Sequence, residues 1–565
     1  MEEHRLTLRS FIVGYILAIL MCAVNSYLVL SFGIMEEGPM IAALFFFAIF
    51  SRSATKITTS EMVIVATMGS AGGSLGFMAN FFAAQAMIAA KTGVDPYTIW
   101  DMLVFSTVSS IVGLISVLIL RQVLVIKDAE LPEEKRLSWV GPKALKGLVD
   151  ALLGEGNSMQ PRYLLFFLLG SIAYILLNSG GVGWFPEAGM ITIGGLAAYG
   201  VGVSFAPFIW GGAYFIGLRT CIGFFVGGVV LLIMAPYLPN PARPHTYIWP
   251  GTMFLVTSGL TALAINWRMI RSALKSLYSF KGGHDENPIM SKKAMIVFTL
   301  IGLALTVVCL YVQFKLTITI IVAMIVFGGL ILNMIATRAQ AQTMINPARV
   351  MGILLMGVNA ALGASSVNQS LTGAGFVAGS GAQGGNLTAD MAYGHWYRIK
   401  ASWQFWTQAA TIIACSLVAA LVFYFLRMNF TLDLDGSGEL PAPIAVIWAN
   451  IALLFDPNIE VVLPPFAIES MLIAGTVGVV WTFLENRPRI RRFLPCSIGF
   501  GLALILPLVY DFGFFFGAVM MFYVLKRFLK FSDITLTTMA IACIVAEGVG
   551  GLLQAILKAV GVIGG

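Results

Sequence analysis

Residues 60–90 read SEMVIVATMGSAGGSLGFMANFFAAQAMIAA, and this stretch decides the class of fold. It is long enough to cross a bilayer, because a transmembrane helix needs about 20 predominantly apolar residues. Similar runs recur along the whole chain, which is 58% hydrophobic and 11% charged, whereas soluble domains carry about 25% charged residues. The runs do not alternate polar and apolar residues as a transmembrane β-barrel requires. The sequence therefore predicts a helical integral membrane protein.

The apolar runs predict an all-α polytopic membrane protein with about 16 (14–16) transmembrane helices in two repeated halves. The first half spans 1–275, a basic linker spans 276–293, and the second half spans 294–565. The excess of Lys and Arg in short loops places the N-terminus and the linker in the cytoplasm. It also explains the net charge of +7 without a nucleic-acid partner. Membrane lipid is the expected surrounding, the inner (cytoplasmic) membrane of the cell is the expected location, and a homodimer is one alternative for the oligomeric state.

Three short motifs recur in the same order at nearly constant spacing. GGSL at 72–75 is followed 312 residues later by GGNL at 384–387. AYGVGVSFAPF at 198–208 is followed 300 residues later by IGFGLALILPL. GPKALKGLVDALL at 141–153 is followed 301 residues later by APIAVIWANIALL. The constant order and spacing favour a duplicated architecture.

The glycines in the first pair of motifs predict helix breaks at 69–76 and 380–387. In duplicated transporters such breaks meet near the midplane, where freed backbone groups bind ions or polar substrate groups. The alternative is tight helix packing without a break, because small residues let transmembrane helices approach closely. The predicted substrate site comprises glycines and polar residues near the two breaks: Gly72, Gly73, Ser74, Asn80, Gln383, Gly384, Gly385 and Asn386.

Ionisable side chains inside apolar segments are costly in hydrocarbon and indicate a function or an ion pair. Glu547 lies deepest, within MAIACIVAEGVGGLLQ, where hydrocarbon favours the protonated carboxyl. Glu61 precedes the first glycine-rich stretch, and Asp390 follows the second. These three acids are the predicted carriers of a coupling proton. Helix-to-helix bonding and exposure at the membrane interface are the structural alternatives for polar residues in such positions.

Three further charged residues lie in or beside apolar segments. Arg219, in GLRTCIGFFVGG, is predicted to bind a substrate carboxylate or to form a structural ion pair. Glu469 and Asp511 lie near the ends of predicted spans, where exposure at the interface is the alternative to a role in transport. The sequence contains no HExxH, P-loop or CxxC motif. We therefore expect no enzymatic activity, no cofactor and no metal site.

At these residues the chain resembles the oligopeptide transporter (OPT) superfamily, which includes the yellow stripe-like transporters. LTLRSFIVGYILAILMCAVNSYLVLSFG (6–33) and TTSEMVIVATMGSAGGSL (58–75) are similar to two family motifs. So are the blocks at 204–238, 389–404 and 546–551. The matched positions are Arg9, Gly14, Asn25, Tyr27, Glu61, Thr67, Ser70 to Leu75, Arg219, Asp390, Gly394, Gln404 and Glu547.

Met62 and Ala66 stand where the family has Asn and Gln, so the resemblance is to a divergent, prokaryotic member. The resemblance implies secondary active import of small peptides, peptide-like solutes or metal chelates, coupled to protons. Two alternatives use the same scaffold. One is a passive channel or facilitator for a small polar solute, and the other is a Na⁺-coupled symporter.

Overall fold

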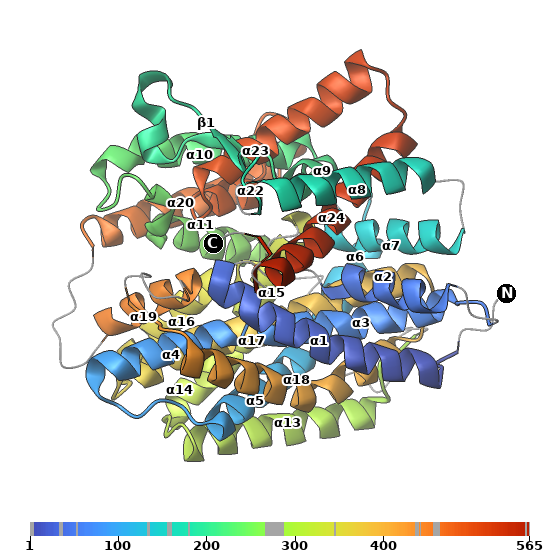
Figure 1. Ribbon diagram of the computed structural model, residues 1–565. Coiled ribbons are helices and arrows are strands. Elements are labelled where there is room, and N and C mark those ends of the chain that lie inside the picture. Colours follow the sequence, from blue (N-terminus) through green and yellow to red (C-terminus); the bar gives the residue numbers. More distant parts are fainter. Residues whose placement is uncertain are drawn as a thin grey trace. The chain divides into compact units, whose positions relative to one another are not determined.

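The chain is described by a computed structural model in which helices dominate (Figure 1). Among the described residues, nine helices are long and apolar enough to cross a membrane, and five shorter apolar helices have 10–17 residues. The predicted all-α polytopic fold is confirmed. The described residues are 5–32, 38–51, 55–132, 136–154, 161–178, 181–265, 287–343, 346–434, 440, 442–455, 464–559 and 562–563. Most of the predicted linker at 276–293 lies outside them.

The chain forms two compact units, and each unit takes segments from both parts of the sequence. Unit 1 comprises Met1–Leu137, Arg268–Arg338 and Asn346–Val462. Unit 2 comprises Ser138–Trp267, Ala339–Ile345 and Leu463–Gly565. The compact units therefore differ from the predicted sequence halves. The division into halves concerns repetition along the chain, and it stays a prediction.

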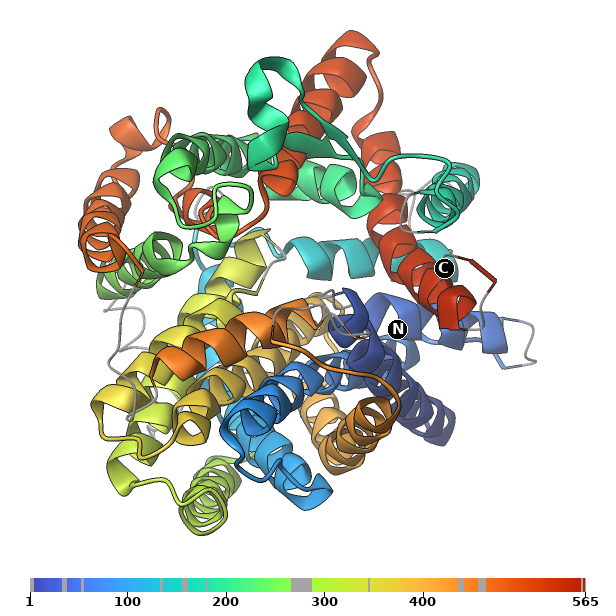
Figure 2. The same ribbon diagram turned by 60° about the vertical axis from the view of Figure 1, so that its left-hand side comes forward.

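Unit 1 is a bundle of helices that run alongside one another in both views (Figures 1 and 2). The π-helical turns η1 and η6 continue α5 and α14 without a break in the chain's helical path. Its helices are α1 (Leu8–Phe32), α2 (Gly38–Phe50), α3 (Thr59–Gly76), α4 (Ala79–Thr92), α5 (Ile99–Leu120), η1 (Arg121–Ile126), α6 (Lys127–Ala129), α13 (Lys292–Val312), α14 (Ile318–Ala323), η6 (Met324–Leu332), α15 (Asn333–Thr343, through Arg338), α16 (Ala348–Ala361), α17 (Val367–Trp396), α18 (Ala401–Asn429) and α19 (Pro443–Leu454).

Unit 2 combines helices with one short antiparallel ribbon, in which Ala188 pairs with Ser204 and Met190 with Gly202. Its elements are α7 (Val140–Leu153), α8 (Pro161–Leu177), β1 (Ala188–Met190), η3 (Ile193–Tyr199), β2 (Gly202–Ser204), α9 (Pro207–Ile216), α10 (Leu218–Met234), η4 (Ala235–Tyr237), η5 (Pro244–Thr246), α11 (Trp249–Ile265), α20 (Ala467–Glu485), α21 (Pro488–Arg491), α22 (Ser497–Ala503), α23 (Leu508–Val519), η7 (Met520–Phe528) and α24 (Asp533–Ala559).

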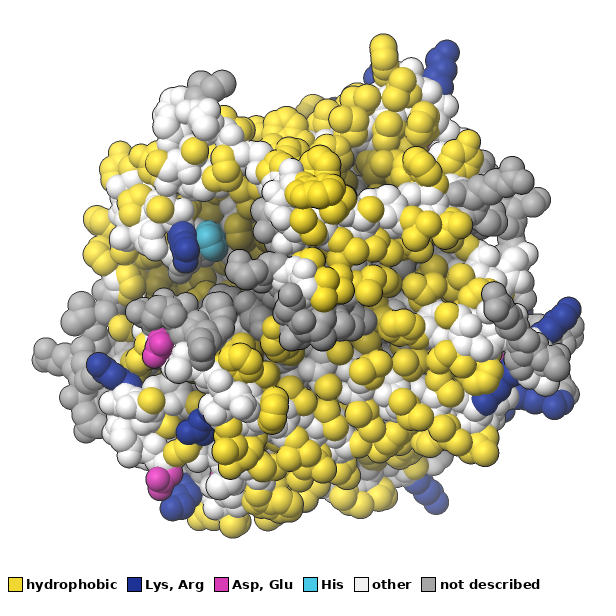
Figure 3. Space-filling model, in the orientation of Figure 1, with side chains coloured by type: hydrophobic (Ala, Val, Ile, Leu, Met, Phe, Trp, Pro, Cys, Tyr) yellow, Lys and Arg dark blue, Asp and Glu magenta, His cyan; other side chains and the backbone are white. Residues whose placement is uncertain are grey.

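The outer surface of unit 1 is apolar, as a lipid-facing surface must be. On α13, Leu300 and Ile301 are 63% and 64% exposed, and on α18 the side chains of Ile413 and Phe425 are similarly exposed. Hydrophobic side chains cover much of the face seen in Figure 3, and charged side chains lie mainly toward its margins. Long apolar helices with exposed apolar side chains place this unit in a membrane.

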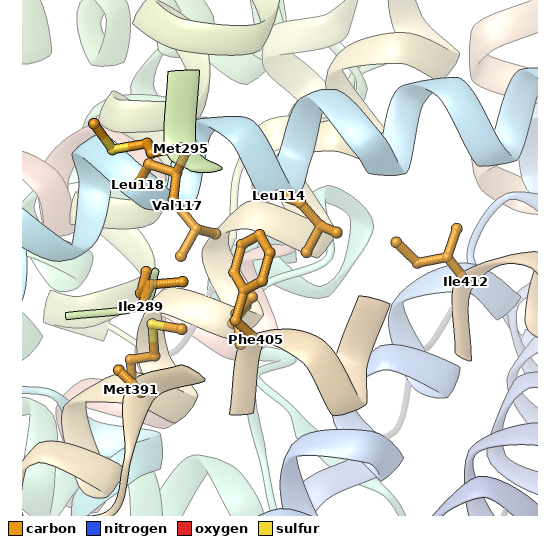
Figure 4. Packing of buried hydrophobic residues seen from close by; sticks show 10 residues of the cluster. Leu114, Val117, Leu118, Ile289, Met295, Met391, Phe405 and Ile412 are labelled. Atoms are coloured by element: carbon orange, nitrogen blue, oxygen red, sulfur yellow. The ribbon is translucent and has the colours of Figure 1, made fainter. Parts of the chain in front are cut away.

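The interior of unit 1 contains a hydrophobic core built from segments that are distant in sequence. Leu114 and Val117 of α5 face Phe405 of α18, with Met391 of α17 on the same cluster (Figure 4). These side chains are buried to within a few per cent. This packing holds α5, α17 and α18 together, and those helices carry many of the polar residues considered below.

The helices do not break at the predicted glycines. Helix α3 is continuous through Gly72 and Gly73, and α17 is continuous through Gly384 and Gly385. A Cβ at Gly72 would overlap the backbone carbonyl of Ala18. One at Gly384 would lie 2.5 Å from Ser116 Oγ. The structure thus differs from the predicted breaks at 69–76 and 380–387, because the missing side chains serve close helix contact.

Helix α3 ends at Gly76, and a turn at Phe77 and Met78 leads into α4. Further helix discontinuities occur at the second repeated motif, in unit 2. Pro207 is the first residue of α9, and Pro507 directly precedes α23 after α22 has ended at Ala503. Proline suits these positions because its ring fixes φ and it has no N–H to satisfy. Gly217, at φ 85°, then separates α9 from α10. In the first turn of α9, the N–H of Ile209 bonds to the carbonyl of Ala206, whereas the N–H of Phe208 has no intrahelical acceptor and can bind another group.

Candidate functional site

The two glycine-rich stretches lie against each other in unit 1. Asn386 Nδ2 donates a 2.7 Å hydrogen bond to Ser74 Oγ, which joins α17 to α3. Ser74 is 2% exposed, so the bond lies in the interior. The motifs that are 312 residues apart in sequence are therefore neighbours in space, although each remains helical.

A buried polar network adjoins this contact and involves α3, α17 and α18. Gln404 Nε2 donates to the backbone oxygen of Asp390 at 2.8 Å and to Thr67 Oγ1 at 3.1 Å. Thr67 Oγ1 also lies 3.3 Å from the hydroxyl of Tyr393. Tyr393 and the carboxyl of Asp390 are in hydrogen-bonding reach of each other. Asp390 is 2% exposed, so this predicted acid lies inside the bundle as part of a network.

Two amide side chains in unit 1 have no hydrogen-bond partner among the described residues. The side-chain nitrogen and oxygen of Asn80 on α4 are both unpaired, and so are those of Gln383 on α17. Both residues are 0% exposed. Gln383 Cβ packs at the surface of Gly113 on α5. An unsatisfied buried polar group costs about 1–3 kcal/mol, so such groups are normally paired with water or a ligand.

Further unpaired polar atoms lie on the helices around these amides. Within the described part of unit 1 they include the hydroxyls of Ser106 and Ser110 on α5 and Oε1 of Gln408 on α18. Gln408 also donates to the backbone oxygen of Gln383, at 3.5 Å. Helices α4, α5, α17 and α18 thus carry unpaired donors and acceptors in the described interior of unit 1.

In unit 2, the side chain of Glu547 on α24, one of the predicted acids, contacts the start of α9. Its Oε2 accepts a hydrogen bond from the backbone N–H of Phe208, in the first turn of α9, at 3.4 Å. The positive end of a helix dipole favours a negative charge, so this position can hold the carboxylate when it ionises. Glu547 is partly buried rather than sealed in the core.

A second acid and two tyrosines surround Glu547. Glu187, which is exposed, interacts electrostatically with Glu547. Tyr174 and Tyr510 each lie within range of both carboxyls. The backbone around Glu187 is fixed because its carbonyl accepts from the N–H of Phe205 at 2.9 Å. A partly buried carboxyl beside an exposed one, with hydroxyl groups nearby, is an arrangement that can pass a proton to solvent.

Arg219 on α10 forms an ion pair with Glu485. Its Nη2 lies 2.7 Å from Oε1 of Glu485, and its Nε donates to the carbonyl of Leu494 at 3.0 Å. Glu485 Oε2 accepts from the backbone N–H of Ser497 at 3.2 Å. The pair therefore connects the start of α10 with the end of α20 and the start of α22.

A family model described as OPT oligopeptide transporter protein matches residues 5–250 and 251–558. The chain belongs to the OPT family. No curated protein matches it. OPT proteins are transporters rather than enzymes, and family membership indicates an oligopeptide or a related small solute as the substrate.

In this OPT transporter, two positions that resemble the family pattern form an ion pair. Arg9 Nε and Nη2 contact the two carboxylate oxygens of Glu61 at 2.5 and 2.6 Å. Glu61 also accepts from Thr7 Oγ1 and from the N–H of Thr58, which completes a capping box at the start of α3. Glu61 is 0% exposed and fully engaged, which favours a structural role over proton transfer.

Glu61→Gln is expected to destabilise this OPT chain by roughly 2 kcal/mol, because hydrogen bonds to a charged partner are lost. Thermal unfolding of the purified protein in detergent measures the change. Glu130→Gln is the matched control, since Glu130 is 61% exposed in its pair with Lys127. That variant should shift stability by less than about 0.5 kcal/mol. Equal shifts in the two variants would contradict the structural assignment.

Several groups in the contacts described above could not be predicted from the sequence alone. The N–H of Phe208 is a backbone group, and Glu187 lies outside the apolar runs. Tyr393 and Gln408 sit inside apolar helices, where a polar side chain is a weak indicator. Among the described residues, no group of three or more His, Cys, Asp or Glu side chains could hold a metal ion.

Proposed function

We propose that this chain is a secondary active transporter that imports small peptides, or peptide-like or metal-chelate solutes, with protons as the coupling ion. The observation that carries the proposal is the pair of buried amides, Asn80 and Gln383, without protein partners among the described residues. The proposal places the chain in the cell membrane.

The chemistry of these amides suits a peptide. A side-chain amide offers one carbonyl acceptor and two N–H donors, the same groups that a peptide bond presents. Contacts of this kind recognise the backbone of a peptide and do not select its side chains. The neighbouring hydroxyls of Ser106 and Ser110 add donors and acceptors that can adapt to different solutes. The same groups could bind the carboxylates of a metal chelate.

The coupling part of the proposal rests on acids in the described interior. Glu547 faces the N–H of Phe208 and has Glu187 nearby, so it can bind a proton in one state and release it in another. Asp390 adjoins the unit 1 network next to the glycine-rich contact. We assign coupling to Glu547 and Asp390, and we assign Glu61 and Arg219 to ion pairs that position helices.

Gln383→Leu tests the proposed substrate site. The variant should fold as well as the wild type, because no protein partner of the side-chain amide is lost, and it should lose the thermal shift that peptides produce. A screen of the purified protein against di- to pentapeptides and metal chelates measures this shift. Gln404→Leu is the matched control, because Gln404 is equally buried but bonds to Asp390 and Thr67.

The control should lose stability by about 1–3 kcal/mol even without peptide. If Gln383→Leu is destabilised to the same extent, or still shows the full peptide shift, Gln383 does not bind the solute. Uptake into proteoliposomes that is indifferent to a pH gradient would favour the passive facilitator. Uptake that follows a Na⁺ gradient would favour the Na⁺-coupled alternative.

A further inference from the structure

A second buried acid in unit 2 plays no part in the contacts described so far. Asp511 lies in the first turn of α23, directly after the discontinuity at Pro507. Its side chain is 0% exposed, and neither carboxylate oxygen has a hydrogen-bond partner among the described residues. The sequence left exposure at the interface as an alternative for this residue, and the structure buries it completely.

The backbone of α10 covers the carboxyl of Asp511. A Cβ at Gly228 would lie 3.1 Å from Asp511 Cβ and 3.3 Å from Oδ2, so the carboxyl fits because residue 228 has no side chain. Aromatic rings line the same interface. Phe224 stacks on Phe514 at 4.8 Å, and the ring of Phe225 lies 5.6 Å from that of Phe512. The carboxyl therefore lies in apolar packing.

No charge among the described residues compensates a carboxylate here. The titratable groups on the packed elements are Arg219 and Cys221 on α10, Tyr214 on α9, Tyr510 on α23, and Tyr523, Lys526 and Arg527 on η7. Arg219 pairs with Glu485, and none of these seven groups interacts electrostatically with Asp511. An isolated buried ion costs far more than a neutral acid, so this packing tolerates only the protonated form.

The repeated motifs point to the same position. With the spacing of 300 residues between Pro207 and Pro507, Asp511 corresponds to Gly211 of α9. A Cβ at Gly211 would lie 2.5 Å from the carbonyl of Ala540 on α24, the helix that carries Glu547. The start of α9 thus has an acid from another helix beside it, Glu547 of α24. The start of α23 carries an acid of its own, Asp511.

We propose that Asp511 is a second proton-binding site of this protein. In the packed state its carboxyl holds the proton. In a state that hydrates the carboxyl, the O–H bond breaks and the proton passes to water, which leaves a carboxylate. The role in transport rests on the proposed proton-coupled import, whereas the protonated state of Asp511 in the packed interface does not.

Infrared spectroscopy of the purified full-length protein at neutral pH tests the protonated state. The wild type should show a C=O stretching band of a neutral carboxylic acid, and Asp511→Asn and Asp511→Leu should both lose part of that band. Asp533→Asn is the matched control, because Asp533 is 65% exposed and paired with Lys526. That variant should keep the whole band. An undiminished band in both Asp511 variants would overturn the proposal.

The thermal unfolding temperature of Asp511→Leu checks whether loss of the carboxyl disturbs folding. A carboxyl without partners contributes no hydrogen bond, so the leucine variant should unfold at or above the wild-type temperature. A large loss of stability in Asp511→Leu would show that the carboxyl has a structural partner, and would overturn the proposal.

Proteoliposomes loaded with trialanine test the role in transport. In Asp511→Asn, accumulation driven by a pH gradient should fall at least tenfold more than trialanine exchange falls. Equal losses in both assays, or no loss in gradient-driven accumulation, would overturn the assigned role. If the wild type moves none of the screened peptides or chelates, the proposed import is wrong, and the infrared result still decides the protonation of Asp511.

Discussion

Glu547→Gln is expected to reduce pH-gradient-driven peptide uptake by roughly 5- to 150-fold, the range that corresponds to a typical coupling free energy of 1–3 kcal/mol. Glutamine has nearly the same shape as glutamate but carries no exchangeable carboxyl proton. Its side-chain oxygen can still accept the hydrogen bond from the N–H of Phe208, so the start of α9 should keep its place. Peptide exchange without a gradient should therefore fall much less than driven uptake.

Both activities are measured on the same proteoliposomes, with driven uptake following an imposed pH gradient and exchange following preloaded labelled peptide. Glu130→Gln serves as the control, because its exposed carboxyl pairs only at the surface with Lys127. It should leave both activities at the wild-type level. If Glu547→Gln lowers exchange as strongly as driven uptake, or does not yield a folded protein, Glu547 has a structural role and the coupling assignment fails.

Gly72→Ala is expected to prevent stable folding. A Cβ at this position would overlap the backbone oxygen of Ala18, and a backbone group gives way only if α1 and α3 move apart. Overpacking of well-packed interiors usually costs about 1–3 kcal/mol, and the cost here should lie at or above the upper end. The measurement is the yield of monodisperse protein and its thermal unfolding midpoint in detergent.

Gly170→Ala is the matched control for this substitution. Gly170 lies within α8, and a Cβ there would meet no atom of another described element within 4 Å. Because alanine forms helices better than glycine by about 1 kcal/mol, this variant should be as stable as the wild type or more so. Wild-type behaviour of Gly72→Ala would mean that α1 and α3 do not touch at this point.

The sequence allowed the fold class and the family to be predicted, because apolar length and ordered motifs depend on the chain alone. It also predicted that the two glycine-rich stretches are related, and they are joined by Ser74 and Asn386. It did not predict whether the helices break there. Glycine permits both a break and a close contact, and the neighbours that decide, such as Ala18 and Ser116, lie elsewhere in the chain.

Proline was the better indicator of discontinuity. Pro207 and Pro507 have no backbone N–H and mark helix starts whatever their surroundings are. The prolines of the second repeated motif are therefore a better basis for predicting a helix discontinuity than the glycines of the first. The environments of the acids depend on distant partners. Arg9 engages Glu61, and Gly228 covers Asp511, and neither relationship has a periodicity or spacing that could reveal it.

The interleaved composition of the two units has a consequence for how the protein is made. Helices α3 and α4 are buried inside the protein except for the last three residues of α4, yet α17 and α18, which pack on α3, are synthesised some 300 residues later. The newly synthesised α3 and α4, with Glu61, Thr67 and Asn80, must therefore stay in the insertion machinery or the bilayer until α17 and α18 have been synthesised. Biosynthesis of this transporter should depend on factors that shield polar helices during insertion, and a chain released after its first 275 residues should be degraded rather than assembled.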